Sequence, residues 1–534
     1  MQRDLARTGS WRFSRRFVRR HGRVNALLFA LGVLVLVLAC VRQGLPAFNP
    51  ESLWLDDLWV ATLVKRASLW ELGRLHAPVP YGFVALEKLV RAGFGDGHIQ
   101  LQAAPFLLRI ASVAGLGWLT AELTRNVGLG LTAAAGLALQ NELAQQALRI
   151  KHYTLDAAIS VGLLALALRF LRQPHCRRLV PLALASLLAL PCSFPSAFVG
   201  PVLMSLCALF YAYDQRKTNP REAMRTLALM AASNLLVLGF IALLVGQKAT
   251  PALQAFWSAY YPPTQGAAKF ASFFRTGPGR DFLTGAFAPV PWLATLVPVG
   301  VLILLSTRWT RPLGVFALVL HAAVLASSLL HLYPLGVPRL DAYVRPIQVL
   351  LAVVALARVR VLHRLSIAVA CVAVLVGVRQ LAAQPVSYIP AAEKPLARHI
   401  VRWIADSRTG LVLFPWANWA FAYYTDEPVE LVPVTDSTNG FFAIPKRPHR
   451  WVLRETWHGV FFSEYARDAA AFSDQLATLF AAPPPRLAFY GGYGDDADYR
   501  AILSQFHNHG YVTLQGHARF GAIAALLEYR PAAR

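Results

Sequence analysis

Long apolar runs, separated by short polar or basic segments, fill the chain from residue 25 to residue 383. About 20 consecutive apolar residues are enough for a helix to cross the hydrocarbon core of a bilayer. The pattern therefore predicts a polytopic α-helical membrane protein with about 11 transmembrane helices. The runs cover residues 25–43, 103–121, 127–142, 155–171, 179–194, 196–213, 225–246, 291–306, 313–331, 343–357 and 365–383.

Residues 384–534 have a different pattern, with turn signals and mixed periodicity. The short apolar segments 411–414 and 487–490 are typical of buried strands, and residues 499–507 of a short helix. We therefore expect a small C-terminal α/β domain. An aromatic cluster here fits either a buried helix face, which we favour, or a sugar-stacking surface. Its members are Trp416, Trp419, Phe421, Tyr423 and Tyr424.

Composition and charge agree with a membrane protein and orient it. Only 15% of the residues are charged, against about 25% in soluble globular chains. The net charge of +24 is concentrated in short clusters between apolar runs, which follows the positive-inside rule and argues against nucleic acid as a partner. If residues 1–24 are a cytoplasmic N-terminus, every second connection is also basic, as expected. These connections contain Arg125; Arg169, Arg172, Arg177 and Arg178; Arg216, Lys217, Arg221 and Arg225; Arg308 and Arg311; Arg358, Arg360 and Arg364.

This topology predicts a multi-pass protein of the inner (plasma) membrane, with a transmembrane domain at residues 25–383 and residues 384–534 outside the cytoplasm. The outer loops are then 44–102, 143–154, 247–290 and 332–342. Within the first loop, the stretch from Tyr81 is amphipathic and too short to span, so we expect an interfacial helix. The five cysteines form no CxxC pair, which argues against zinc and disulfide scaffolds.

Two adjacent carboxylates, Asp56 and Asp57, lie just beyond the first apolar run. Carboxylates inside the hydrocarbon cost about 2.5–3.5 kcal/mol each on insertion scales, and a position just outside avoids this penalty. There they can act on a lipid-linked substrate. The alternative is a helix N-cap, where Asp is favoured in any case. Successive helical residues point about 100° apart, so the two carboxylates would not share one task.

Two further polar clusters fall on predicted outer loops. The segment from Arg149 to Asp156 contains Lys151, His152 and Tyr153 as well, a set that suits a phosphorylated headgroup. Its alternative is a solvated helix start in which Asp156 complements the helix dipole.

The other cluster is the Pro- and Gly-broken segment from His331 to Tyr343. Its Arg339 lies on the predicted outer side of the membrane, where the positive-inside rule disfavours a cation, and therefore needs an anionic partner. That partner is either Asp341 or a lipid phosphate.

These clusters, in this order and on one side of the membrane, resemble those of membrane glycosyltransferases with the GT-C fold. The similarity is to relatives such as the protein O-mannosyltransferases and the lipid A aminoarabinose transferase, over roughly residues 25–385. The matching motifs are Leu55-Asp56-Asp57-Leu58-Trp59, His76-Ala77-Pro78-Val79-Pro80-Tyr81, Phe94-Gly95-Asp96, Leu107-Leu108-Arg109, Arg149 to Asp156, Tyr333 to Arg339, and Tyr343-Val344-Arg345-Pro346. Two positions depart from the family pattern: Asp57 stands where Glu is usual, and Val79 separates the two prolines.

The resemblance implies sugar transfer from a polyprenyl-phosphate donor to a lipid, glycan or protein acceptor at the outer face of the membrane. Asp56 would be the general base, while Asp57 would orient the acceptor, a cation or a metal. A divalent cation at this pair stays open, and no other cofactor is expected. The implied binding roles are the donor phosphate for Arg149, Lys151 and Arg339, the acceptor or sugar for Asp156, and other substrate contacts for His76, Tyr81, His152, Tyr153 and Tyr343.

Two other functions compete with a transferase. A transporter of a lipid-linked or anionic substrate would need ionisable groups near mid-membrane and interrupted helices. The charges here cluster in loops, although three prolines between residues 191 and 201 interrupt one region. A membrane-anchored scaffold is the second alternative, but anchoring requires far fewer spans.

Overall fold

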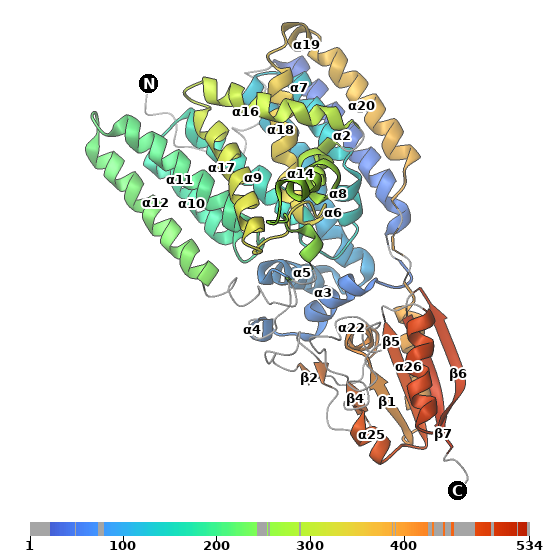
Figure 1. Ribbon diagram of the computed structural model, residues 1–534. Helices are drawn as coiled ribbons and strands as arrows, with labels where there is room; N and C mark the ends of the chain where they lie inside the picture. The colour runs from blue at the N-terminus through green and yellow to red at the C-terminus, as the bar shows by residue number, and fades with distance from the viewer. Residues whose placement is uncertain are drawn as a thin grey trace. The chain divides into compact units, whose positions relative to one another are not determined.

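The helices and strands described below belong to a computed structural model of the 534-residue chain. The structure describes residues 22–48, 50–72, 79–242, 254, 257–287, 290–386, 388–389, 391–425, 430–431, 442–443, 450–452, 476–492, 496–520 and 522–530. These residues divide into two units (Figure 1). The first unit comprises residues 1–47 and 103–387, and the second comprises residues 48–102 and 388–534.

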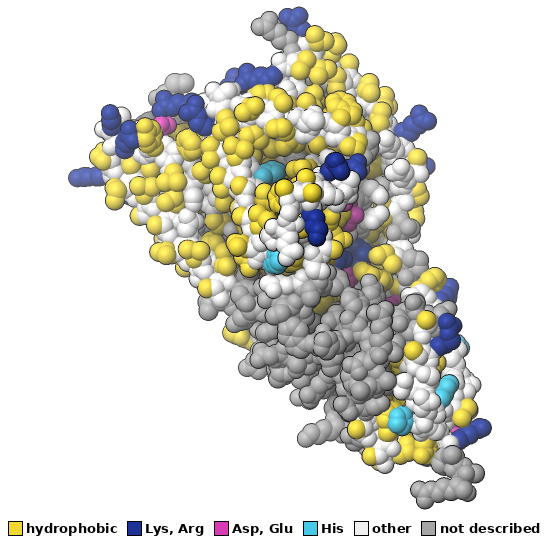
Figure 2. Space-filling view, viewed as in Figure 1, with side chains coloured by type: hydrophobic (Ala, Val, Ile, Leu, Met, Phe, Trp, Pro, Cys, Tyr) yellow, Lys and Arg dark blue, Asp and Glu magenta, His cyan; other side chains and the backbone are white. Residues whose placement is uncertain are grey.

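Most of the predicted apolar runs form long helices in the structure. Among the described residues, seven helices are long and apolar enough to cross a membrane. They are α2 (Arg23–Gly44), α6 (His98–Thr124), α9 (Tyr153–Arg172), α11 (Ser196–Gln215), α12 (Pro220–Phe240), α17 (Arg311–Leu329) and α20 (Ser366–Ala383). Figure 2 shows a largely hydrophobic surface on the part of the molecule that these helices form, with most of its Lys and Arg side chains at the edges, a distribution typical of membrane proteins.

The other four runs are helical but shorter or bent. Three of them fall on α7 (Val127–Ala138), α10 (Cys176–Ala189) and α18 (Arg345–Leu356). The run 291–306 is η5 (Pro291–Thr295) with α16 (Leu296–Ser306), and it bends by 97° against residues 278–287. The described helices therefore give seven or eight spans, so the predicted count of about eleven is not confirmed. The outside position of the C-terminal domain, which rested on that count, stays a prediction.

Small residues allow close helix packing in the first unit. A Cβ on Gly130 of α7 would come within 2.6 Å of the Gly117 carbonyl oxygen of α6, so only glycine fits at this crossing. Helices α10, α11 and α12 lie side by side (Figure 1). The buried positions of α9 recur every three or four residues, from Ala157 through Val161 and Leu164 to Leu168, and face this core.

Shorter elements fill the connections of the first unit. Gly336 has a positive φ of 77°, and a Cβ there would lie 1.8 Å from the Pro278 carbonyl oxygen. Glycine is therefore required where the segment after α17 meets α15. These elements are η1 (Leu45–Ala47), α8 (Asn141–Gln146), η3 (Ser258–Tyr260), α14 (Ala267–Thr276), α15 (Pro278–Thr284), η4 (Gly285–Phe287), η6 (Leu340–Tyr343) and α19 (Arg360–Arg364).

The second unit contains the predicted α/β domain. Its mixed sheet has the order β4-β1-β5-β7-β6, with β1 parallel to β4 and β5, and β7 antiparallel to its neighbours. Both predicted strands, in β1 and β5, and the predicted helix, α26, are confirmed. The strands are β1 (Thr409–Leu413), β4 (Arg450–Val452), β5 (Arg486–Gly492), β6 (Tyr511–Arg519), β7 (Ala522–Tyr529), and the antiparallel pair β2 (Glu430–Leu431) and β3 (Phe442–Ala443).

Helices complete the second unit. In α21 the buried residues Leu396, Ala397, Ile400 and Ile404 form one apolar face, which packs against β5 and β7. The aromatic cluster falls on α22, and its described side chains from Trp419 onward are at least partly buried, which supports the core interpretation. The helices are α3 (Leu55–Arg66), α4 (Leu69–Leu72), α5 (Tyr81–Phe94), α21 (Glu393–Ile404), α22 (Pro415–Tyr424), α25 (Ala477–Ala481) and α26 (Asp496–Asn508).

Candidate functional site

The predicted site residues belong to both units, and each group is described within its own unit. Asp56, Asp57 and Tyr81 are in the second unit. Arg149, Lys151, His152, Tyr153, Asp156, Arg339 and Tyr343 are in the first unit. His76 lies outside the described residues.

Asp56 and Asp57 are in the first turn of α3. The N-cap is Trp54, which has no capping side-chain bond, so the expected alternative of an Asp N-cap is wrong. The positive end of the helix dipole nevertheless favours both carboxylates. Asp57 is fully buried, whereas Asp56 is half-buried, as expected for successive helical positions that point in different directions.

Two tyrosines from the C-terminal part of the chain hold the start of α3. The Tyr388 hydroxyl donates to Oδ2 of Asp57 and accepts from the Trp54 backbone N–H at 3.1 Å. The Tyr424 hydroxyl accepts from the backbone N–H of Leu53 at 2.6 Å. Neither contact was predictable from the sequence, where Tyr424 stands out only as a member of the aromatic cluster, because contacts across more than 300 positions leave no local signal.

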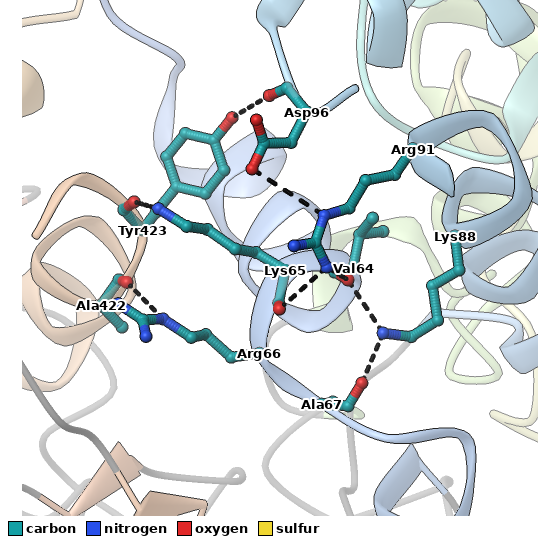
Figure 3. Close-up of polar contacts among 9 residues, drawn as sticks. All are labelled: Val64, Lys65, Arg66, Ala67, Lys88, Arg91, Asp96, Ala422 and Tyr423. Atoms are coloured by element: carbon teal, nitrogen blue, oxygen red, sulfur yellow. Dashed lines mark hydrogen bonds and ion pairs between the residues drawn. The ribbon is translucent and has the colours of Figure 1, made fainter. Parts of the chain in front are cut away.

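Basic side chains complete the other end of α3 (Figure 3). The Lys88 Nζ donates to the carbonyls of Val64, at 2.8 Å, and Ala67, and Arg91 donates to Val64 at 3.2 Å. The last carbonyls of a helix have no intrahelical partner and carry partial negative charge, which cations satisfy.

Two other side chains in Figure 3 extend from α3 to α22. Lys65 donates to the Tyr423 carbonyl at 2.7 Å, and Arg66 donates to the Ala422 carbonyl at 3.1 Å. These bonds give the basic residues of this region a structural role, because they fix α3 against α5 and α22.

The predicted interfacial helix is α5, which Tyr81 begins. Burial raises the pKa of the Tyr81 phenol. Leu89 and Phe94 are exposed on its surface, whereas Glu87 is fully buried. Within the described part of the chain, neither carboxylate oxygen of Glu87 has a hydrogen-bond partner. Burial raises the pKa of Glu87 to about 8, so its carboxyl group is protonated at neutral pH.

In the first unit, the cluster at the start of α9 is buried. Arg149 is 7% exposed, Lys151 5% and Asp156 1%, so the alternative of a solvated helix start is wrong. His152 is also buried, and its Nε2 lies 3.7 Å from Oδ2 of Asp156. The His152 ring contacts Tyr153, with ring centres 4.6 Å apart.

Two basic side chains lie at the N-terminal end of α9. Arg149 and Lys151 precede this terminus, where the helix dipole is also positive, and both are buried. Cationic side chains and the backbone N–H groups of a helix N-terminus are the groups that bind phosphate in many proteins. The arrangement is therefore suited to an anionic ligand such as a phosphate.

The third cluster packs against α9 through η6. Tyr343 is fully buried, and its hydroxyl has no hydrogen-bond partner among the residues that the structure describes. Burial, and then the charges of Asp341 and Asp156, raise the pKa of Tyr343. The same burial raises the pKa of Asp341 to about 7, although the Arg345 cation opposes this shift.

Arg339 is half-buried and lies over an aromatic ring. Its guanidinium carbon is 5.4 Å from the centre of the Trp257 ring. The structure thus gives Arg339 a cation–π partner, and the cation whose charge acts on Asp341 is Arg345.

A pocket of about 550 Å³ opens beside this segment in the first unit. Its wall includes Lys269 and the stacked rings of Tyr261 and His331, whose centres are 4.6 Å apart. His331 also has a positive φ of 57°, which is uncommon for a residue other than glycine. Of the predicted clusters, the segment from His331 to Tyr343 contributes to the lining, through His331.

The described residues contain no cluster that could hold a metal ion by itself. Among the described residues, no three His, Cys, Asp or Glu side chains converge. A cation at Asp56 and Asp57 would need further ligands from the substrate or from solvent, as Mg²⁺ commonly does.

The groups in the two units differ in the chemistry that they offer. The second unit supplies a half-buried carboxylate whose neighbour is fixed by hydrogen bonds. The first unit supplies buried cations, an imidazole and phenols. A carboxylate can accept a hydroxyl proton, and cations can stabilise a departing phosphate.

No model of a known protein family matches the sequence, and neither does any curated protein. Solved structures are similar, however. ArnT from Cupriavidus metallidurans in the apo state superposes with a TM-score of 0.53 at 13% identity, covering 94% of this chain and 97% of that one. ArnT from the same organism bound to undecaprenyl phosphate gives a TM-score of 0.54, with the same identity and coverage.

The arabinofuranosyltransferase AftD from Mycobacteria has 16% identity and covers 94% of this chain but only 39% of its own, with a TM-score of 0.42, too low to support an argument. The similarity to ArnT over nearly the whole of both chains establishes the fold. This chain has a GT-C membrane fold with a C-terminal sheet domain, as the order of its motifs predicts. It is a multi-pass membrane protein.

Proposed function

We propose that this protein is a glycosyltransferase that moves a sugar from a polyprenyl-phosphate donor to a lipid, glycan or protein acceptor. The observation that carries the proposal is the burial of Arg149 and Lys151 at the N-terminus of α9, in a chain with this fold. One of the similar ArnT structures is bound to undecaprenyl phosphate. A buried pair of cations at a helix N-terminus suits the phosphate of such a lipid.

The reaction needs little covalent chemistry from the protein. The acceptor oxygen forms a bond with the anomeric carbon of the sugar while the bond from that carbon to the phosphate oxygen breaks. The phosphate leaves with the electron pair as polyprenyl phosphate, and the hydroxyl proton passes to a base. The protein must therefore supply a base and stabilise the negative charge of the leaving group.

We assign the base to Asp56, because it is the more accessible carboxylate of the pair. Asp57 orients the acceptor or a cation, and Asp156 binds the acceptor or the sugar. Arg149, Lys151 and Arg339 hold the phosphate, and Tyr343 donates to it. His76, Tyr81, His152 and Tyr153 complete the substrate contacts.

We also propose how the protein is oriented in the plasma membrane. Residues 1–24 are cytoplasmic, and residues 384–534 are on the outer side, where the transfer takes place. The basic connections between spans support this orientation.

The test is sugar transfer in membranes from cells that make wild-type or Asp56→Asn protein at equal levels. Labelled polyprenyl-phosphate sugars are the donors, and envelope extract from the same cells supplies the acceptor. We expect Asp56→Asn to lose at least about 100-fold in rate, the usual contribution of a general base. Asp406→Asn is the matched control, because Asp406 is a partly exposed carboxylate of the same unit that pairs with Arg408 and Arg486 and belongs to none of the motifs.

The outcomes separate the alternatives. Equal transfer by wild type and Asp56→Asn would move the base to Asp57 or Asp156. Absence of transfer by the wild type with every donor would contradict the transferase and favour a transporter, which flux of the labelled lipid across reconstituted vesicles would then detect.

A further inference from the structure

One side chain from the C-terminal half of the chain touches the Asp pair directly. Tyr388 follows the last spanning helix, and its hydroxyl bridges two groups at the start of α3. It donates to Oδ2 of Asp57 and accepts from the N–H of Trp54, the N-cap residue. A single phenol thus binds both the carboxylate and the helix terminus that carries it.

Further hydrogen bonds hold the segment that precedes α3. The hydroxyl of Tyr424 accepts from the N–H of Leu53 at 2.6 Å. The backbone N–H of Lys394 donates to Oγ of Ser52 at 3.1 Å. Residues 388–424 therefore hold residues 52–57 by hydrogen bonds from α21, from α22 and from Tyr388 in the segment before them.

We propose that Tyr388 is the positioning residue of the Asp pair, and that residues 388–424 are consequently part of the active site. This inference rests on the proposed function. Tyr388 fixes Asp57, which is fully enclosed. The next helical residue back, Asp56, is then directed about 100° away and is the carboxylate that meets the substrate.

The physical basis is a charge-assisted hydrogen bond in a buried place. A phenol that donates to a carboxylate makes a bond about twice as strong as one between neutral groups. Loss of this bond frees the first turn of α3 to rotate or fray, because the Trp54 N–H also loses its partner. A small displacement of Asp56 then slows proton transfer without removing substrate contacts.

The experiment replaces Tyr388 with Phe in the full-length protein. We expect kcat for sugar transfer to fall about tenfold, as for loss of one charge-assisted hydrogen bond, while the KM values for donor and acceptor change less than about twofold. Tyr511→Phe is the matched control, because it removes a buried tyrosine hydroxyl of the same unit that donates to the Pro484 carbonyl and lies outside residues 388–424. Its kcat should stay within about twofold of wild type.

A double-mutant cycle tests whether Tyr388 acts through Asp57. The thermal unfolding temperature is measured for the purified wild type, Tyr388→Phe, Asp57→Asn and the double variant. We expect the shift caused by Tyr388→Phe to shrink in the Asp57→Asn background, because contacting residues are not additive. The shift caused by Tyr511→Phe should be the same in both backgrounds.

The two measurements distinguish the ways in which the account can fail. Wild-type transfer with an unchanged kcat in Tyr388→Phe would overturn the positioning role and leave the proposed function intact. Additive unfolding shifts for Tyr388 and Asp57 would overturn the contact itself. If the unfolding shifts are coupled but the wild type transfers no sugar, the hydrogen bond between Tyr388 and Asp57 has only a structural role. This outcome would contradict the transferase.

Discussion

Basic side chains are used in two different ways in the two units. In the second unit, Lys65, Arg66, Lys88 and Arg91 donate to main-chain carbonyls at the ends of α3 and α22 (Figure 3). In the first unit, Arg149 and Lys151 are buried beside the N-terminus of α9, where the helix dipole adds to their charge. Cations at a helix C-terminus stabilise the fold, whereas buried cations at a helix N-terminus create a place for an anion.

The carboxylates differ in the same way. Asp57 is tied to Tyr388 and fixes the start of α3. Asp156 lies among His152 and the buried phenols, in the cluster that we assign to substrate. Some charged groups therefore stabilise the fold around the site, and others are placed to bind a ligand. Each experiment below tests one of these two roles.

The largest effect is expected for Asp156→Asn. This change replaces the carboxyl group 3.7 Å from Nε2 of His152 with an amide and keeps the shape of the side chain. We expect kcat/KM for the acceptor to fall by about 100-fold or more, as steady-state transfer assays would show. Asp214→Asn, in an exposed ion pair with Arg308 of the same unit, should transfer like the wild type. Equal rates for both variants would remove Asp156 from the site.

Glu87→Gln should stabilise the second unit, and more so as the pH rises. The folded-state pKa of Glu87 is about 8, above its ordinary value of 4.5. Unfolding therefore releases a proton between these values, so the wild type loses stability as the pH rises from 4.5 to about 8. The amide that replaces the carboxyl group in Glu87→Gln is neutral at every pH in this range.

We expect the unfolding temperatures of wild type and Glu87→Gln to be close at pH 5 and the variant to be higher at pH 8. Thermal unfolding in detergent at several pH values measures the difference. A constant difference across this range would show that the Glu87 carboxyl group is already ionised in the folded protein.

The smallest effect is expected for Lys88→Met, which keeps the aliphatic stem and removes the donors to the carbonyls of Val64 and Ala67. Stability should fall by about 2 kcal/mol, as for two lost hydrogen bonds, with the donor affinity unchanged. Denaturant unfolding and lipid binding measure the two quantities. Arg308→Met, at an exposed ion pair, should change neither. Weaker donor binding by Lys88→Met would contradict a purely structural role of Lys88.

The sequence predicted the fold class well, because hydrophobic periodicity is a local signal. Every apolar run contains a helix, and strands β1 and β5 lie where short apolar segments indicated them. The number of spans was less predictable, since α7, α10 and α18 are too short and the segment around residue 290 is bent. The length of an apolar run does not show where its helix begins, ends or bends.

The candidate site was predicted only in part, for a physical reason. Asp56, Lys151 and Asp156 stand out because charged residues are expensive next to apolar runs. The burial of Lys151 could not be read from its polar neighbours, which favoured a solvated helix start equally well. Tyr388 gave no signal, because its role depends on a hydrogen bond to Asp57, 331 positions away.

The most direct test of the account is the affinity of the purified protein for polyprenyl phosphate, measured by titration of the labelled lipid against Lys151→Gln and Asp56→Asn. The account predicts that Lys151→Gln binds at least about tenfold more weakly than the wild type, since it loses a charge-assisted contact to phosphate, and that Asp56→Asn binds like the wild type. Equal binding by Lys151→Gln and the wild type would contradict the assignment of the α9 cluster to the lipid phosphate.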